Sequence, residues 1–395
     1  MNRILNLALW VSLSVWMAAG AMAQTVKIGL ISTYSGPNAQ YGENIERGLR
    51  LYMKHNADKL PPGVRIELIT RDDGGPNPDA AKRLAQELIV RDKVNFLTGF
   101  VWTPNAMAVA PIITEAKVPT VILNAASSQI TTRSQYFARF SFTEWQVSYP
   151  LGQWAAKRYK RAYQMVSDYA PGYDAEDSFA KGFTEGGGQI IGKVRVPLGS
   201  PDFTPFMQRA MDARPEIVFG FVPAGKLSTA LMKAFSDLGM DKANIRLIGS
   251  GNLTTDEELQ GMGDVTLGKV TTYHYSVAAD RPANKAFQAM FVKEYGDKVV
   301  GNFVTVTAWD AMDAIYAAIR AQGGKVDPDR TMDLLRNYKN PNSPRGPISI
   351  DPETRDIVQN IYIREVRRVG NQLANVELET IPNVKDPWKE FNRGK

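Results

Sequence analysis

The chain contains no cysteine and only two histidines among its 395 residues. The missing thiol excludes disulfide bonds, cysteine nucleophiles and cysteine-ligated metals. The two histidines, His55 and His274, lie far apart in the sequence, so a zinc site is not expected. We therefore expect neither a metal nor a cofactor.

Long runs of lysine and arginine are also missing, although the formal net charge is +6. The densest basic patch, residues 364–368, is interrupted by Glu365 and Val366, so nucleic-acid binding is not expected. Three Gly-x4-Gly-Lys segments lack the Ser or Thr that follows the lysine of a P-loop, and a Gly-x-Ser-x-Gly elbow is absent. These absences predict that the protein is not an enzyme.

A long apolar run occurs only at the N-terminus. It follows Arg3, extends from Ile4 to Ala19, and precedes the small-x-small pattern Ala21-Met-Ala23. This combination predicts a secretory signal peptide, residues 1–23, that is cleaved after Ala23. No later stretch is long enough to span a bilayer, and no cysteine is available for a lipid anchor. The mature chain is therefore expected to be exported without membrane insertion.

From Gln24 onward the pattern alternates between strands and helices, which predicts an α/β fold. The first run, to about Phe142, has strand patterns at 26–30, 64–69, 94–97 and 119–123. The alternation restarts after about Thr143, with strand patterns at 162–167, 189–194, 216–222 and 245–248. Beyond about Tyr275 two helices are followed by strand patterns at 348–350, 357–369 and 376–381. The sequence thus predicts two successive α/β units of similar size.

Short loops rich in Gly, Ser, Thr, Asn and aromatic residues follow three strands of the first unit. They surround Tyr34 and Tyr41, Trp102, and Ala125. Because the carboxyl ends of parallel strands meet at one edge of a sheet, these loops should lie together, where ligands bind in such folds. Aromatic side chains here either stack on a ligand or pack locally within the fold.

The chain resembles a type I periplasmic solute-binding protein of the Leu/Ile/Val-binding family of ABC importers. The resemblance extends over nearly all of the chain from Gln24 and rests on segments 35–42, 71–73, 124–127 and 168–172, in this order behind a signal peptide. It implies two lobes, each a mostly parallel sheet flanked by helices, joined by three crossovers around a ligand cleft. The implied lobes are 24–142 plus 275–346, and 143–274 plus 347–395. It also implies a monomer in the periplasm.

The resemblance also implies a ligand site. Thr103, Ala125 and Ser127 match the positions that hold the ligand carboxylate, and Tyr41 matches an aromatic residue that packs on the ligand. The second lobe contributes Tyr169 and Phe221. The remaining candidates at cleft positions are Tyr34, Trp102, Asn252 and Tyr273.

One departure from the family concerns the ligand. Amino-acid-binding members carry an acidic residue after the strand that ends here at Ile248, whereas residues 249–255 contain none. Because a buried ammonium without a carboxylate is costly, we expect an aromatic carboxylate, such as a benzoate or a hydroxycinnamate, rather than an α-amino acid. The expected function is capture of this small molecule for a membrane permease of an ABC importer. The alternatives are import of a branched-chain or other amino acid, with Glu144 or Asp168 pairing the ammonium, and ligand sensing for a chemoreceptor or signalling partner.

Overall fold

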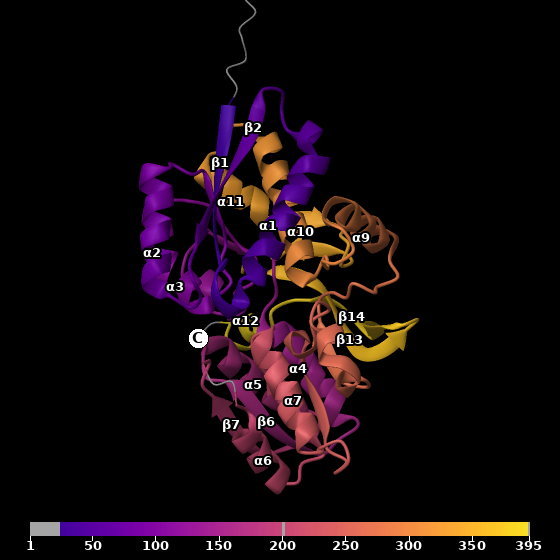
Figure 1. Cartoon of the computed structure of the whole chain (residues 1–395). Coiled ribbons are helices and arrows are strands. Elements are labelled where there is room, and N and C mark those ends of the chain that lie inside the picture. Colours follow the sequence, from indigo (N-terminus) through magenta and orange to yellow (C-terminus); the bar gives the residue numbers. More distant parts are fainter. Residues whose placement is uncertain (1–23, 200–201, 394–395) are drawn as a thin grey trace, which may run out of the picture.

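The computed structural model describes residues 24–199 and 202–393, so the predicted signal peptide lies outside the described residues. Two sheets with helices on both faces lie one above the other, and β13, β14 and α12 lie near their junction (Figure 1). In the described part of the chain, no helix combines the length and the hydropathy of a membrane span.

The first sheet has five parallel strands in the order β2-β1-β3-β4-β5. The strands are β1 (Gln24–Ser32), β2 (Val64–Asp72), β3 (Phe96–Gly99), β4 (Thr120–Ile122) and β5 (Phe137–Arg139). One face packs on α1 (Gln40–His55), α10 (Phe303–Ala321) and α11 (Pro328–Arg336), and the other on α2 (Pro78–Gln86) and α3 (Thr103–Ala116). α9 (Pro282–Tyr295) packs beside α10. Helices on both faces bury the central strands, which explains their continuous apolar character, whereas the edge strand β2 is only partly buried.

The second sheet has the order β11-β12-β13-β10-β9-β8-β6-β7, and β14 pairs with β13. Its parallel strands are β6 (Arg161–Ser167), β7 (Gln189–Val196), β8 (Ile217–Phe221), β9 (Arg246–Ser250) and β10 (Val270–Tyr273). The antiparallel part contains β11 (Lys339–Asn340), β12 (Ile348–Ile350), β13 (Ile357–Val369) and β14 (Gln372–Val384). One face packs on α4 (Glu144–Ala156) and α5 (Ala170–Glu185), and the other on α6 (Thr204–Asp212) and α7 (Lys226–Asp237). Two short helices, α8 (Leu259–Met262) and α12 (Pro387–Phe391), complete the fold.

The two sheets share one topological feature. β1 lies between β2 and β3 in the first sheet, and β6 lies between β7 and β8 in the second. The direction of strand order reverses at these points, so loops leave the carboxyl ends on opposite sides and open a crevice. The chain passes from the first sheet to the second after β5, returns through α9, α10 and α11, and re-enters the second sheet at β11.

Most predicted elements are confirmed, and local signals set several of their ends. Asn77 caps α2, where its side chain accepts a hydrogen bond from the N–H of Ala80, as the Asn-Pro pair predicts. The predicted strand 94–97 is shifted to β3. The helix α4 was not predicted, because it is buried on nearly all sides and therefore shows no amphipathic period. It begins with a capping box between Thr143 and Gln146.

Candidate functional site

A small cavity lies where the two crevices face each other. Its empty space of about 330 Å³ includes some of the open solvent at its mouth. The first sheet's side provides Tyr41, Val101, Trp102, Thr103, Asn124 and Ala126. The segment between β5 and β6 provides Phe142 and Glu144, and the second sheet's side provides Tyr169, Pro171, Phe221, Pro223 and Asn252. A ligand in this cavity would therefore contact both sheets' loops at once.

The loop after β3 holds Trp102 by hydrogen bonds. The indole Nε1 of Trp102 donates to the Thr33 hydroxyl at 2.9 Å, and that hydroxyl donates to the buried carboxylate of Asp73 at 2.7 Å. The loop is reached through Gly99, whose φ of +105° suits glycine and whose backbone lies against the carbonyl of Ile31. The ring of Trp102 is thus fixed as a wall of the cavity.

Arg139, at the end of β5, orients the neighbouring loop after β4. Its guanidinium donates to the carbonyl oxygens of Ala125 at 3.2 Å, Ser127 at 2.8 Å and Phe142 at 3.4 Å. The same side chain forms a buried ion pair with Asp356, with Nε 2.9 Å from Oδ1. A charged side chain from one strand therefore fixes the peptide planes of a loop more than ten residues earlier.

These fixed carbonyls determine where the loop's N–H groups point. In a trans peptide the N–H is directed away from the preceding carbonyl, so the Ala126 N–H points away from Arg139. The N–H groups of Ala125 and Ser128 donate to the Phe100 carbonyl and to Asp174, at 3.0 and 2.9 Å, and that of Ser127 donates to the Thr103 hydroxyl at 3.3 Å. The N–H of Ala126, on a cavity-lining residue, has no acceptor among the described residues and can therefore meet a ligand.

Thr103 lies beside this amide, at the first position of α3. The first N–H groups of a helix have no intrahelical acceptor. The Thr103 hydroxyl accepts a hydrogen bond from the Ser127 N–H, so the hydrogen of this hydroxyl remains free to be donated to a ligand. Together with the Ala126 amide, these donors form a site suited to a carboxylate, without lysine or arginine among the lining residues that the structure describes.

Aromatic rings form the other walls. The rings of Tyr41 and Trp102 have centroids 6.4 Å apart, and those of Tyr169 and Phe221 are nearly parallel at 6.1 Å. The first pair belongs to the first sheet's side and the second pair to the second sheet's side. Burial raises the pKa of the Tyr41 and Tyr169 hydroxyls, so both remain neutral. The cavity is therefore apolar on two opposing sides.

Six of the predicted site residues line this cavity: Tyr41, Trp102, Thr103, Tyr169, Phe221 and Asn252. Of the others, Tyr34 donates its hydroxyl to Glu46 at 2.7 Å and packs beside α1. Ala125 and Ser127 flank the lining residue Ala126 without being part of the lining. Tyr273 lies behind the wall, where its hydroxyl donates to Asn252 at 2.7 Å.

Several lining residues were missed by sequence reasoning: Val101, Asn124, Ala126, Phe142, Pro171 and Pro223. Most of them lie in a loop that follows a strand, and this signal could have found them, because their neighbours in the same loops were predicted from it. Glu144, considered only as an alternative partner for an ammonium, also lines the cavity. It is the first residue of α4 and its backbone N–H donates to the Ala126 carbonyl at 3.1 Å. His274 is fully buried and stacks on Phe142, with ring centroids 5.1 Å apart.

Polar contacts also join the two sides directly. Each links a loop or helix start on the first sheet's side to a loop on the second: Asn38 to the Ala224 carbonyl at 3.4 Å, Gln40 to Glu258 at 3.0 Å, and Asn302 to Glu257 at 2.9 Å. These contacts hold the two sides together around the cavity.

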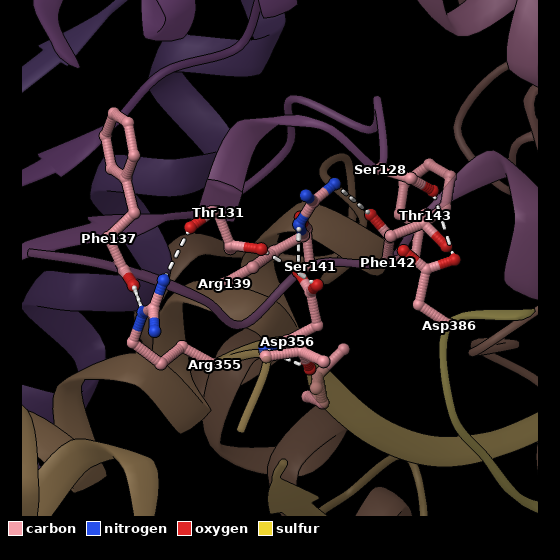
Figure 2. Close-up of polar contacts among 12 residues, drawn as sticks. Ser128, Thr131, Phe137, Arg139, Ser141, Phe142, Thr143, Arg355, Asp356 and Asp386 are labelled. Atoms are coloured by element: carbon pink, nitrogen blue, oxygen red, sulfur yellow. Dashed lines mark hydrogen bonds and ion pairs between the residues drawn. The ribbon is translucent and has the colours of Figure 1, made fainter. Parts of the chain in front are cut away.

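The buried cluster around Arg139 predicts a pH dependence of stability. Burial, with a contribution from Asp356, raises the pKa of Asp386 to about 7, and Asp386 accepts a hydrogen bond from Ser128 (Figure 2). An aspartate in the unfolded chain titrates near pH 4. Between about pH 4 and 7 the folded state therefore binds a proton that the unfolded state has lost, and stability should decrease as the pH rises through this window.

We expect Asp386→Asn to remove the part of the pH-dependent loss of stability that comes from the Asp386 carboxyl. Asparagine can still accept from Ser128 and cap α12, so the variant should fold. The measurement is urea unfolding of both proteins at pH 5 and pH 7.5. An equal pH dependence in the two proteins would show that Asp386 does not titrate in this window.

Comparison with known proteins identifies the family. A family model described as periplasmic binding protein matches residues 25–371. Leu/Ile/Val-binding protein homolog 6 of Brucella melitensis is 41% identical over 372 residues, which cover 94% of this chain and 95% of that protein.

Two solved structures are similar over nearly the whole chain. One is a solute-binding protein of an ABC transporter from Rhodopseudomonas palustris BisB5 in complex with 3,4-dihydroxybenzoic acid, with 47% identity, a TM-score of 0.88, and coverage of 92% of this chain and 99% of that chain. Another, from R. palustris in complex with 4-hydroxybenzoate, has 43% identity, a TM-score of 0.88, and coverage of 92% and 98%. The predicted family and the predicted two-lobed α/β fold are confirmed by these matches. The chain belongs to the periplasmic binding protein family, as one of its ABC-transporter solute-binding proteins.

Proposed function

We propose that this protein captures an aromatic carboxylate in the cavity between its two sheets and delivers it to a membrane permease. The observation that carries the proposal is the pairing of an uncharged anion site with aromatic walls. The Ala126 amide and the Thr103 hydroxyl and N–H group would hold the carboxylate. The rings from both sides would hold a flat apolar body.

The shape of the walls supports an aromatic body over an aliphatic one. Trp102 and Tyr41 face the ligand from the first sheet's side, and the nearly parallel Tyr169 and Phe221 face it from the second. Aromatic pairs in offset or edge-to-face contact contribute about 0.5–1.5 kcal/mol beyond their buried area. The two R. palustris relatives bind hydroxylated benzoic acids, which have this combination of a ring and a carboxylate.

In this proposal the ligand is bound without being transformed. The mature chain, cleaved after Ala23, would act in the periplasm as a monomer with lobes 24–142 plus 275–346 and 143–274 plus 347–395. A ligand that contacts both lobes favours the closed form by its differential affinity, and the permease would recognise that form. The contacts between Gln40 and Glu258 and between Asn302 and Glu257 would form on closure.

A second candidate is a branched-chain amino acid. It is supported by the buried carboxyl of Glu144 in the cavity and by the name of the B. melitensis relative. An ammonium would require an ionised partner, because a buried unpaired charge is costly. The protonation state of Glu144 therefore separates the two candidates.

Small-angle scattering with a ligand panel tests the proposal. Saturating 4-hydroxybenzoate or 3,4-dihydroxybenzoate should reduce the radius of gyration and raise the melting temperature, since ligand binds only the folded, closed form. Leucine and valine should change neither quantity. A response to leucine or valine with no response to any aromatic acid would contradict the proposal.

The anion site predicts the effect of Thr103→Val. Valine keeps the shape of threonine but removes the hydroxyl, so the affinity for an aromatic acid should fall about 10- to 100-fold, as expected for one hydrogen bond to a charged group. Isothermal titration calorimetry measures this change. Thr103→Ser retains the hydroxyl and serves as the control, with affinity close to that of the unmodified protein. Equal affinity of the valine and serine variants would place the carboxylate elsewhere.

A further inference from the structure

Glu144 is a buried acid in the cavity that the proposed anion site does not use. Its side chain is fully buried, with 0% of its surface exposed. Its Oε2 receives a long contact from the Ser148 hydroxyl at 3.5 Å, and among the described residues Oε1 has no hydrogen-bond partner. Buried polar atoms are nearly always paired, so this unpaired oxygen in a ligand cavity indicates a missing partner.

The surroundings of Glu144 do not support an ionised carboxylate. Asp174 on α5 is the charged group that acts on it, and it is acidic. The tyrosines close enough for the Glu144 charge to raise the pKa of their hydroxyls are Tyr41 on α1, Tyr169 in the loop after β6, and Tyr273 on β10. Burial, followed by Asp174, raises the pKa of the Glu144 carboxyl well above its usual value, and no described lysine or arginine offsets this.

We propose that Glu144 meets the bound ligand as a neutral carboxylic acid and donates a hydrogen bond from its O–H to an oxygen atom of that ligand. A protonated carboxyl offers one O–H donor, which a carboxylate lacks, and it keeps some acceptor capacity. Because its backbone N–H is bonded to Ala126, Glu144 lies next to the anion site, where an ionised carboxylate would repel the ligand. The neutral form lets an acidic ligand and this acidic residue share one closed cavity.

This inference rests on the proposed function and gives Glu144 the role of a specificity-determining residue. A neutral acid cannot compensate an ammonium, so it selects against α-amino acids. It selects for ligands with an oxygen acceptor in reach. The oxygen belongs either to the ligand's carboxylate or to a ring hydroxyl, and ligand pairs distinguish these sources.

The test compares Glu144→Gln with Glu144→Leu by calorimetric titration of 4-hydroxybenzoate. Glutamine keeps the size and retains an N–H donor, so its affinity should stay within about threefold of the unmodified protein. Leucine keeps the volume but removes the donor, so its affinity should fall about 10- to 100-fold. Glu185→Gln, an exposed glutamate on α5, is the matched control and should leave the affinity unchanged. Urea unfolding of each variant confirms that it is folded.

Benzoate distinguishes the two oxygen sources. If the ring hydroxyl is the acceptor, the leucine variant should lose affinity for 4-hydroxybenzoate but not for benzoate. If the carboxylate is the acceptor, both ligands should lose affinity equally. Either pattern supports the proposal, because both require a donor at Glu144.

A pH profile separates a proton-donating role from a merely structural one. As the pH rises through the pKa of Glu144, the unmodified protein should lose affinity for benzoate, whereas Glu144→Gln should not. Three results would overturn the inference: a loss of affinity for 4-hydroxybenzoate in Glu144→Gln as large as that in Glu144→Leu, an unchanged affinity for 4-hydroxybenzoate in a folded Glu144→Leu, or identical pH profiles of the unmodified protein and Glu144→Gln. Failure of the unmodified protein to bind any aromatic acid would instead refute the proposed function.

Discussion

Replacing Arg139 with methionine should lower the free energy of unfolding by at least about 3 kcal/mol and abolish measurable binding of an aromatic acid. Arg139 and Asp356 are 0% and 1% exposed, and removing one partner leaves an unmatched charge in the interior. Lys389 remains 3.1 Å from Asp356 and offsets part of this charge. The carbonyls of the loop after β4 would still lose their donor, and the Ala126 amide its orientation. Urea unfolding and calorimetric titration measure the two effects.

Arg158→Met provides the matched control. Arg158 forms an ion pair with Glu379 at 3.1 Å, but the two side chains are 41% and 52% exposed. Exposed pairs contribute about 0–1 kcal/mol, so this variant should be nearly as stable as the unmodified protein and should bind ligand normally. If both variants lost equal stability, or if Arg139→Met retained full affinity, the orienting role of Arg139 would be wrong.

Gly99→Ala should destabilise the protein by about 2–5 kcal/mol and disrupt the ligand site. An alanine Cβ at this position would lie 2.1 Å from the carbonyl oxygen of Ile31, and the φ of +105° is unfavourable for any residue with a side chain. The clash is with backbone, so a side-chain movement cannot relieve it. The loop that carries Trp102 and Thr103 would have to shift. Thermal or urea unfolding, followed by titration, tests both consequences.

Gly261→Ala is the corresponding control. Gly261 lies in α8, and a Cβ there would meet no atom within 4 Å. Alanine in place of glycine in a compatible conformation stabilises by about 0.4–1 kcal/mol. Equal destabilisation by the two substitutions would mean that the geometry at Gly99 is not the cause.

The fold was predictable because its signals are local. Apolar periods, the Asn77 cap and the turn residues after strands recover most elements of both sheets, although β5, β10, β11 and α11 were not predicted. The helix α4 could not be found in this way, since burial on most sides removes the period on which such predictions depend. The order of strands is likewise a property of the whole chain.

The site was predictable only to the level of loops. Trp102 and Thr103 lie three and four residues after the end of β3, so their place in the cavity follows from the parallel sheet. Ala126, rather than Ala125 or Ser127, presents its N–H to the cavity because Arg139, more than ten residues away, sets the orientation of the peptide planes in this loop. Tyr34 lies outside the cleft, where its hydroxyl donates a hydrogen bond to Glu46, a partner that no sequence pattern indicates.

Calorimetric titration of the mature protein with 4-hydroxybenzoate and with leucine decides whether the cavity binds an aromatic carboxylate or an amino acid. We expect saturable binding of one 4-hydroxybenzoate per chain and no binding of leucine. Saturable binding of leucine, with no heat from 4-hydroxybenzoate, would contradict this expectation.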